Sequence, residues 1–495
     1  MLFIEVVETS ARVAATGSRT AKVAALAETL ARAEGAELEI LAHYLSGSLR
    51  QRRTGVGWRS LVARPEPTDA PRLTLTDVDA AFAELSLLTG TGSQGARQGL
   101  LAELMGSATA SEQEFLAGLV TGETRQGALE GVLLPAIAQA FTVGLDAVRR
   151  AAMFAGSIPV VAVAAAAGGE PALAGITLQV GRPVLPMLAS SAPDIPSALE
   201  RFGIGTTVAV EAKLDGIRIQ VHREGERISV YSRSLDDITA RLPAVVAATA
   251  ALPARRLVLD GEALALRPDG RPMLFQDTAS AGSGLTPFFF DLLLIDDLDL
   301  VDEPTSVRHD RLTRLVPPSL LVDRLVTADP EAASAFSQTV LASGHEGVVL
   351  KALDAGYSAG RRGASWVKVK PVHTLDLVVL AVEWGSGRRK GWLSNIHLGA
   401  RADDGSFVML GKTFKGMTDQ MLAWQTERFL ALETHREGHV VFVRPEQVVE
   451  IAFDGLQRST RYPGGVALRF ARVLRYREDK TAAEADTIET VRALS

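Results

Sequence analysis

The sequence contains no cysteine in its 495 residues. A disulfide scaffold, a cysteine-ligated zinc site and a thiol nucleophile are therefore excluded. Long hydrophobic runs are also lacking, because the longest apolar stretch, near 158–167, is too short to span a bilayer. The N-terminal segment MLFIEVVETS carries acidic residues where a signal peptide needs basic ones. We therefore expect a cytoplasmic protein without a membrane segment.

An excess of positive charge is lacking as well. The 58 acidic residues outnumber the 52 Lys and Arg residues, and the formal net charge is −6. Such a chain does not coat nucleic acid by bulk charge, but it can still contain a local basic groove. Residues 1–180 have a net charge of −4, whereas the windows 361–390 and 461–480 have net charges of +5 and +4. We expect phosphate groups to bind at these two windows.

The length predicts about three domains, at roughly 150 residues per domain. Residues 1–178 are rich in Ala and Leu and have helical periodicity, which predicts an all-α domain. Residues 181–371 alternate β-branched runs with helical stretches, which is typical of an α+β domain, and residues 372–495 carry the short strands of a β-barrel. The predicted fold class is therefore a multidomain α and β protein.

Local signals refine this division. In the first domain, apolar spacing predicts helices over 21–33 and 116–145, Ser111 and Glu114 have the spacing of a capping box, and the segment 168–171 predicts a linker. In the other two domains the strands are expected at 207–210, 217–221, 228–231, 257–259, 288–295, 347–350, 375–382, 396–400, 407–410, 440–443 and 447–452.

One lysine is a candidate nucleophile. Lys213 lies in the segment Glu211-Ala212-Lys213-Leu214-Asp215-Gly216-Ile217-Arg218, between two predicted strands. A lysine beside a turn can attack an electrophile if neighbouring cations favour its neutral form. The pattern Lys-x-Asp-Gly arises by chance in roughly one chain of this length in twenty. Taken alone, it is more typical of a surface turn with a solvated lysine.

Other polar motifs follow Lys213 in a fixed order. They are Ser232-Arg233, Asp260-Gly261-Glu262, Phe290-Asp291, Glu346 to Lys351, Trp366 to Lys370, and Arg477-Glu478-Asp479-Lys480. Each motif has a structural alternative when it stands alone: an aromatic residue in a strand usually belongs to the core, and a charged C-terminal tail is common. The ordered set resembles the six nucleotidyltransferase motifs of the ATP-dependent DNA ligase and mRNA-capping superfamily. The segments 181–189 and 468–480 also resemble parts of cellular DNA ligases.

The resemblance implies a role for each candidate. Lys213 would attack the α-phosphorus of ATP and become a lysyl-AMP, while Lys368 and Lys370 would favour the neutral amine and neutralise phosphate charge. Glu211 would accept a hydrogen bond from the adenine amino group, and Phe290 would stack on the adenine.

The remaining candidates would bind the rest of the nucleotide. Glu262 would bind the ribose, and Glu262 and Glu346 would provide oxygen ligands to Mg²⁺ or Mn²⁺. The family contacts AMP, its phosphate or the nick phosphate at positions that match Arg218, Arg233, Lys351 and Arg362.

The flanking domains have expected functions too. The C-terminal barrel would be an OB-fold domain that brings Arg477, Asp479 and Lys480 to ATP only when it rotates over the nucleotide. The segment 115–127 resembles the Gly-x-x-Arg-x-Gly region of the helical DNA-binding domain of cellular DNA ligases, where Arg125 would contact phosphate. A turn between helices with one exposed arginine is the alternative interpretation.

The resemblance therefore implies an ATP-dependent DNA ligase of bacterial type. It would seal nicks in duplex DNA through lysyl-AMP and DNA-adenylate intermediates, as a monomer that encircles the DNA. The alternatives are an RNA ligase or capping-type nucleotidyltransferase, which the long N-terminal helical region disfavours, and a non-catalytic nick-binding scaffold, which would not need Lys213. NAD⁺ is disfavoured as the adenylyl donor because the zinc module typical of that branch requires cysteine.

Overall fold

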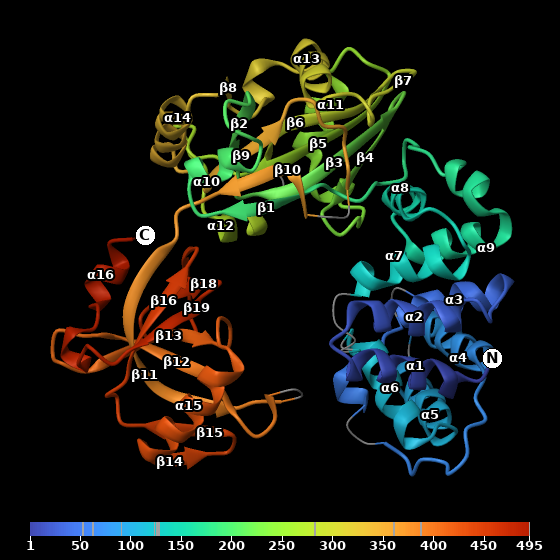
Figure 1. The fold of residues 1–495 in the computed structure, drawn as a ribbon, viewed down its shortest axis with the longest axis horizontal. Helices are drawn as coiled ribbons and strands as arrows, with labels where there is room; N and C mark the ends of the chain where they lie inside the picture. Colours follow the sequence, from blue (N-terminus) through green and yellow to red (C-terminus); the bar gives the residue numbers. More distant parts are fainter. Residues whose placement is uncertain are drawn as a thin grey trace.

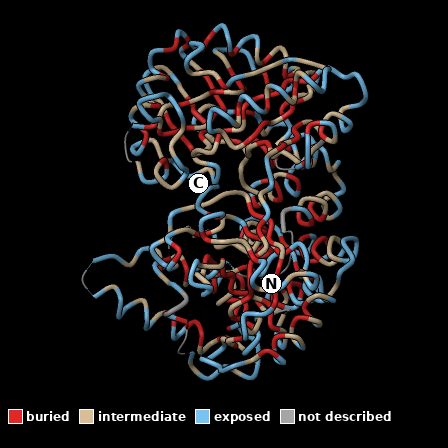
Figure 2. Tube along the Cα trace, turned by 90° about the vertical axis from the view of Figure 1, so that its left-hand side faces the viewer, coloured by how far each residue is buried: buried red, intermediate tan, exposed pale blue. Residues whose placement is uncertain are grey.

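The computed structural model describes residues 1–51, 54–61, 64–90, 92–122, 124, 129–281, 284–359, 362–386 and 389–494. Figure 1 shows three groups of elements along the chain: N-terminal helices, two sheets with their helices in the middle, and a C-terminal group of strands. In Figure 2 buried residues gather inside the groups, and the connecting loops are mostly exposed. No described helix combines the length and hydrophobicity that a membrane crossing requires.

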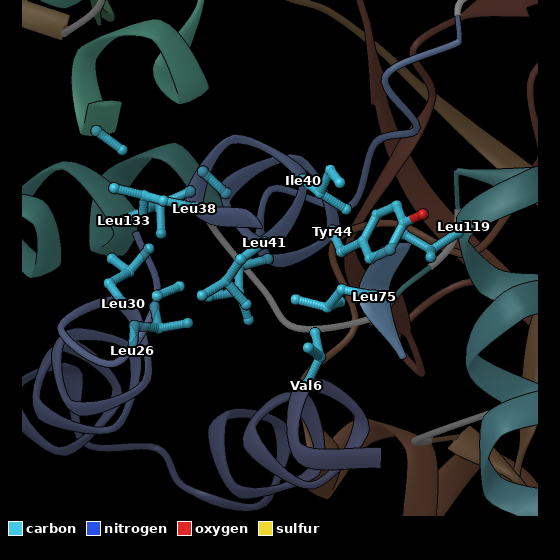
Figure 3. Close-up of a cluster of buried hydrophobic side chains, with 14 of the residues drawn as sticks. Val6, Leu26, Leu30, Leu38, Ile40, Leu41, Tyr44, Leu75, Leu119 and Leu133 are labelled. Atoms are coloured by element: carbon cyan, nitrogen blue, oxygen red, sulfur yellow. The ribbon is translucent and has the colours of Figure 1, made fainter. Parts of the chain in front are cut away.

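The N-terminal group is built from helices that pack on one hydrophobic core. They are α1 (Phe3–Ala15), α2 (Arg19–Leu30), α3 (Gly35–Leu45), α4 (Leu75–Leu87), α5 (Ser93–Gly106), α6 (Ala110–Thr121), α7 (Leu129–Ala140), α8 (Leu145–Ala155) and α9 (Ile158–Ala174), with a 3-10 helix at Trp58–Leu61. Figure 3 shows Leu26 and Leu30 of α2 close to Leu38 and Leu41 of α3 in this core. The apolar residues recur at helical spacing, so each helix buries one face.

The predicted capping box is wrong by two residues. Thr109 is the N-cap of α6, its hydroxyl accepts from the backbone N–H of Glu112, and the Glu112 carboxylate accepts from the backbone N–H of Thr109 at 2.8 Å. Ser111 lies inside the helix. Both pairs have the same spacing, and only Thr109 has the extended backbone that an N-cap requires.

Two other boundaries also differ from the predictions. The helical stretch at 116–145 is interrupted, because Gly122 ends α6 in the left-handed conformation with φ +71°. The expected linker at 168–171 lies inside α9, which continues to Ala174 and is kinked where Gly168 and Gly169 leave helical φ/ψ values. The glycines therefore bend the helix where a linker was predicted.

Two five-stranded sheets form the middle group. The first has the order β1 (Leu188–Ala192), β10 (Arg362–Val369), β9 (Gly347–Ala352), β2 (Val208–Lys213) and β8 (Arg324–Thr327). The second has the order β4 (Arg227–Ser232), β3 (Ile217–Glu224), β5 (Arg256–Leu264), β6 (Thr286–Ile295) and β7 (Leu298–Asp299). The accompanying helices are α10 (Ile195–Glu200), α11 (Pro243–Ala250), α12 (Phe275–Ser280), α13 (Thr305–Leu315) and α14 (Pro330–Ala342), with 3-10 turns at Thr239–Arg241 and Pro318–Leu320.

The C-terminal group is a seven-stranded sheet with an additional hairpin. Its strands are β11 (His373–Trp384), β12 (Leu393–Arg401), β13 (Phe407–Thr413), β14 (Glu433–Glu437), β15 (Val440–Val443), β16 (Val448–Phe453) and β19 (Arg472–Arg477), and the hairpin is β17 (Gly455–Arg458) with β18 (Val466–Arg469). The helices are α15 (Asp419–Ala431) and α16 (Ile488–Arg492), with a 3-10 turn at Ala482–Glu484. The long strand β11 pairs with β12, β15 and β16, so it holds the curved sheet together. Every strand range expected from the sequence overlaps an observed strand.

Both flanking groups contact the middle one. On α8, Met153 and Phe154 share a buried cluster with Val258 and Leu293, and Arg150 makes a bidentate ion pair with Asp302 at 2.6 and 2.7 Å. On the other side, strands and loops of the C-terminal group make ion pairs with the middle group: Arg469 with Asp215, Arg458 with Asp277, and Asp454 with Lys370. The C-terminal contacts are therefore polar, whereas the N-terminal contact is partly apolar.

Gly347 provides a test of the packing between β9 and β10. Its φ is +147°, and a Cβ atom there would collide with the backbone oxygen of Val369 and lie 2.9 Å from Cα of Lys370. We expect Gly347→Ala to lower the free energy of unfolding by about 1–3 kcal/mol, because backbone atoms must move. Urea denaturation measures the change. Gly99→Ala in α5 is the control, because an added Cβ atom there would meet no other part of the protein within 4 Å. It should be neutral or slightly stabilising. Equal losses in both variants would contradict the steric explanation.

Candidate active site

A pocket of about 790 Å³ opens between the two central sheets. The short turn that joins β2 to β3 crosses from one sheet to the other, and Lys213 is the last residue of β2 before this turn. Ten of the predicted site residues line the pocket: Glu211, Lys213, Arg218, Arg233, Glu262, Phe290, Glu346, Lys351, Lys368 and Lys370. Residues separated by up to 159 positions in the sequence are thus brought to one cavity.

The turn after Lys213 requires glycine. A Cβ atom on Gly216 would lie 2.5 Å from the backbone oxygen of Ala263 and 2.9 Å from Leu264. With no side chain, Gly216 packs closely on β5, and its backbone N–H donates to the Glu262 carboxylate at 3.2 Å. The same contact fixes the start of β3 and the position of Glu262.

Glu346 binds two lysines at the centre of the pocket. Its carboxylate forms an ion pair with Lys213 and a second one with Lys370 at 2.9 Å, and all three side chains are at most 23% exposed. Lys370 also pairs with Asp454 of the C-terminal group. Burial alone would raise the pKa of Glu346, but the two facing lysines lower it below its ordinary value. Glu346 is therefore an ionised group between two cations.

Arg218 is held rigidly at the side of the pocket. It makes a bidentate ion pair with Asp260 at 2.9 and 2.6 Å, and Tyr357 donates its hydroxyl to the same carboxylate at 2.8 Å. Burial acts against the Arg218 charge, but Asp260 outweighs it and raises the arginine pKa. The guanidinium is therefore a permanent, oriented cation, suited to a phosphate or a ribose oxygen.

Aromatic rings form another wall. Phe290 and Trp366 meet edge to face with their centroids 6.0 Å apart. The Lys351 ammonium lies 4.7 Å from the Phe290 centroid and 4.2 Å from the Trp366 centroid, and the Arg218 guanidinium lies 5.1 Å from the Phe290 centroid. A flat aromatic base can bind against such a wall.

Two pocket carboxylates could bind a metal ion. Burial raises the pKa of Glu262 to about 7 against the opposing effects of Arg218 and Lys213, so a cation at this carboxylate would be favourable. In the described residues no group of three or more His, Cys, Asp or Glu side chains could hold a metal alone. Glu262 and Glu346 fit Mg²⁺, which commonly takes one or two carboxylates and completes its shell with phosphate and water oxygens.

Three predicted residues lie away from the pocket lining. Arg477 and Lys480 both pair with Asp376 on β11, at 2.9 and 2.7 Å, and Asp479 pairs with Arg477 at 2.6 Å. For Arg362 the structure places only the backbone, opposite Leu188 in the pairing of β10 with β1. The predicted DNA contact Arg125 lies outside the described residues.

Several pocket residues were missed by the sequence reasoning. Asp454, Arg469 and Phe470 come from the C-terminal group, and Phe275 comes from α12. Arg469 and Phe470 lie in the segment 468–480 that resembles DNA ligases, but none of the four residues was assigned a site role from the sequence. The docking of the C-terminal group brings Asp454, Arg469 and Phe470 to the cavity. Arg324 was missed as well, and it binds Glu211 at 2.7 Å because β8 pairs with β2.

A pocket that combines several cations, carboxylates and an aromatic wall is typical of enzymes that transfer a nucleotide. Three family models match the chain: "DNA ligase N terminus" over residues 59–138, "ATP dependent DNA ligase domain" over 186–370 and "ATP dependent DNA ligase C terminal region" over 389–480. The chain belongs to the family of ATP-dependent DNA ligases, which join DNA strands at nicks.

Relatives along the whole chain agree with this assignment. A probable DNA ligase of Nocardioides sp. is 63% identical and covers 100% of this chain and 99% of its own length. A probable DNA ligase of Beutenbergia cavernae is 60% identical and covers 100% of both chains. A solved structure named Pmar-Lig_PreS3 shares the fold, with a TM-score of 0.65 at 19% identity over 96% of this chain and all of its own.

The Glu346 ion pairs predict a pH-dependent stability. Because its folded pKa is lowered, its contribution is complete above its ordinary value of 4.5 and is lost as the pH falls through the folded pKa. Glu346→Gln should lower the free energy of unfolding by about 1–3 kcal/mol at pH 7, and the difference from the unsubstituted protein should shrink below pH 4.5.

Urea denaturation at several pH values measures this difference. Glu28→Gln, which removes the exposed pair of Glu28 with Arg12, is the matched control and should change stability by less than about 1 kcal/mol. A Glu346→Gln effect that stays constant from pH 7 to acidic pH would contradict an electrostatic origin.

Proposed function

We propose that the chain seals nicks in duplex DNA with three cooperating domains. Residues 1–178 would be the helical DNA-binding domain, residues 181–371 the adenylation domain, and residues 372–495 an OB-fold domain. The observation that carries the proposal is the position of Lys213 in a pocket with Glu346 and Lys370.

In the first step Lys213 attacks ATP. The neutral Nζ atom forms a bond to the α-phosphorus, the bond to the bridging oxygen of the pyrophosphate breaks, and pyrophosphate leaves. Nζ attacks as the neutral amine, so the ammonium loses one proton before the attack and Nζ loses a second one as the P–N bond forms. Lys368 and Lys370 would neutralise charge on the phosphates. The proposed adenine position is against Phe290, with Glu211 at its amino group. Arg218 and Arg233 would bind the ribose and phosphate. Lys351 and Arg362 would also contact AMP, its phosphate or the phosphate at the nick.

The second and third steps pass AMP to the DNA and release it. A 5′-phosphate oxygen at the nick attacks the lysyl-AMP, the P–N bond breaks, and Lys213 recovers its proton. The 3′-hydroxyl then attacks the activated 5′-phosphorus, loses its proton, and AMP leaves as the strand is sealed. Mg²⁺ held by Glu262 and Glu346 would neutralise charge on the phosphates. Besides this neutralisation of charge, the protein would contribute by holding the reacting groups in the right orientation.

The C-terminal motif would act mainly in the first step. Arg477, Asp479 and Lys480 would orient the pyrophosphate while the OB-fold domain covers ATP. In the domain arrangement described above, Asp376 neutralises Arg477 and Lys480. We propose that this pairing holds the motif when DNA, and not ATP, is engaged. A rotation of the OB-fold domain would move the motif between these two positions. The motif would complete the site when ATP is bound and leave it when DNA is bound.

The proposed substrate is nicked double-stranded DNA, bound by a monomer that encircles it in the cytoplasm. Two basic windows, 361–390 and 461–480, support this because they lie in the two domains next to the pocket. Their lysines and arginines would neutralise backbone phosphates, so binding should weaken with salt. The region 115–127 would add backbone contacts from the helical domain.

Lys213→Ala should abolish the covalent enzyme–AMP adduct. The enzyme is incubated with labelled ATP, GTP or NAD⁺ and Mg²⁺, and a nicked duplex is then added. The unsubstituted protein should be labelled by ATP and pass the label to DNA, whereas Lys213→Ala should show no label, because no other nucleophile occupies its position. Labelling of the Lys213→Ala protein would refute the assignment of the nucleophile, and labelling by GTP alone would favour a capping enzyme.

Lys480→Ala should impair self-adenylylation more than sealing. The rate of lysyl-AMP formation is compared with the rate at which the variant seals a pre-adenylylated nick, which bypasses the first step. We expect a loss of roughly tenfold or more in the first rate and a small change in the second, since Lys480 would contact the pyrophosphate only in the ATP-bound state. In the other state it pairs with Asp376, away from the pocket lining. Equal losses in both rates would refute the proposed role of the C-terminal motif.

A further inference from the structure

Arg324 makes an ion pair behind the pocket that none of the nucleotidyltransferase motifs contains. It begins the edge strand β8, which pairs antiparallel with β2 so that Arg324 lies directly opposite Glu211. Its Nη1 atom donates to Oε1 of Glu211 at 2.7 Å, and the two side chains are only 7% and 4% exposed. The pair is therefore shielded from water and strengthened by the low local dielectric.

The second oxygen of Glu211 is also engaged. Lys351 forms an ion pair with Oε2 at 2.5 Å, and its side chain is 2% exposed. Two cations thus hold one buried carboxylate by both oxygens. An ionised carboxylate has lone pairs but no proton, so Glu211 can accept hydrogen bonds from a ligand and cannot donate one.

Glu211 faces the part of the pocket where a base can lie. Glu211 and Lys213 are two residues apart on β2 and project from the same face, at a spacing of roughly 7 Å along the strand. A nucleotide whose α-phosphate is at Lys213 can therefore reach Glu211 with its base. Glu211 lines the pocket together with Phe290 and Trp366, whereas Arg324 is not among the described lining residues. Arg324 thus acts on the ligand only through Glu211.

We infer that Arg324 is a positioning residue that sets the preference for adenine over 6-oxopurines. This rests on the proposed position of the adenine ring. Adenine presents an amino donor at C6, which the Glu211 carboxylate accepts, whereas guanine and hypoxanthine present an oxygen that a carboxylate repels. Without Arg324, Oε1 is left unpaired in a buried position. The carboxyl group can then turn away from the position in which it accepts from the C6 amino group.

Neighbouring groups do not replace Arg324. Arg308 of α13 is already paired with Asp291 of β6, with contacts of 2.7 and 3.0 Å, and it does not hold Glu211. His309 of α13 interacts electrostatically with Arg324 and Glu211, and burial and the Arg324 charge lower its pKa, which disfavours its charged form. Its Nδ1 atom has no hydrogen-bond partner among the described residues. The charge that holds Oε1 therefore comes from Arg324.

The test compares ATP with inosine triphosphate, whose base carries oxygen at C6 and no 2-amino group. Binding constants for both nucleotides are measured by calorimetry in a Lys213→Ala background, where the covalent step is absent. Adding Arg324→Met should lower the ATP to inosine triphosphate preference by roughly tenfold to a hundredfold, because a charge-assisted contact is lost. Arg324→Lys, which keeps the charge, should stay close to the starting preference.

A double-substitution cycle shows whether Arg324 acts through Glu211. In a Glu211→Gln background, Arg324→Met should no longer change the preference, since the carboxylate that it positions is absent. Arg223→Met is a matched control: Arg223 is a part-buried arginine of the same domain that donates to the backbone oxygens of Thr249 and Leu252. It should leave the preference unchanged.

Arg324→Met could instead weaken the binding of both nucleotides equally and leave the preference unchanged. That result would overturn the inference and assign Arg324 a structural role. If Arg324→Met does not fold, as judged by thermal denaturation, Arg324→Gln takes its place under the same criterion. Failure of the proposed function is a different result: the unsubstituted enzyme would form no lysyl-AMP with ATP, while the binding preference would still decide the role of Arg324.

Discussion

The balance of charge around Glu346 is the constraint on which the site depends. One carboxylate lies between Lys213 and Lys370. Lys213 ends β2, Glu346 directly precedes β9, and Lys370 directly follows β10. Three neighbouring strands can bring their ends together only if the lysines do not repel each other, and the ionised Glu346 prevents that repulsion. Gly347, which directly follows Glu346, allows the close approach of β9 to β10. The chemistry and the packing of the strands therefore depend on the same few atoms.

The same charge network extends into the C-terminal group. Lys370 also pairs with Asp454, and Arg469 pairs with Asp215 beside the nucleophile. Arg477 and Lys480 are meanwhile engaged by Asp376. Polar contacts of this kind can be exchanged if each ion gains water or a new partner when it is released. A domain held by such contacts can rotate, whereas α8 is held to the middle group partly by buried apolar side chains. This contrast is consistent with an N-terminal contact that persists while the C-terminal domain moves.

Much of the sheet structure was predictable because its signal is local. Runs of β-branched residues between turns predicted the strand positions, and Lys213 was expected beside a turn between two strands, where it lies. The N-terminal helices were less accurately bounded. Thr109 and Ser111 offer the same cap spacing to Glu112 and Glu114, and the backbone conformation decides between them. Gly168 and Gly169 predict a break in the helix, but whether the chain leaves the helix or only bends depends on the packing of neighbouring helices.

The sequence alone determined the chemistry that the protein carries. The order of its motifs pointed to the family, and the absence of cysteine removed the zinc-bearing alternative, since both are properties of the residues themselves. Only the tertiary structure decided which of these groups meet. Strand register places Arg324 against Glu211 and brings ten predicted residues to one pocket, and the docking of the C-terminal group adds Asp454 and leaves Arg477 on Asp376. Contacts between distant segments depend on how strands pair and domains pack in three dimensions. The spacing of residues along the chain does not reveal these contacts.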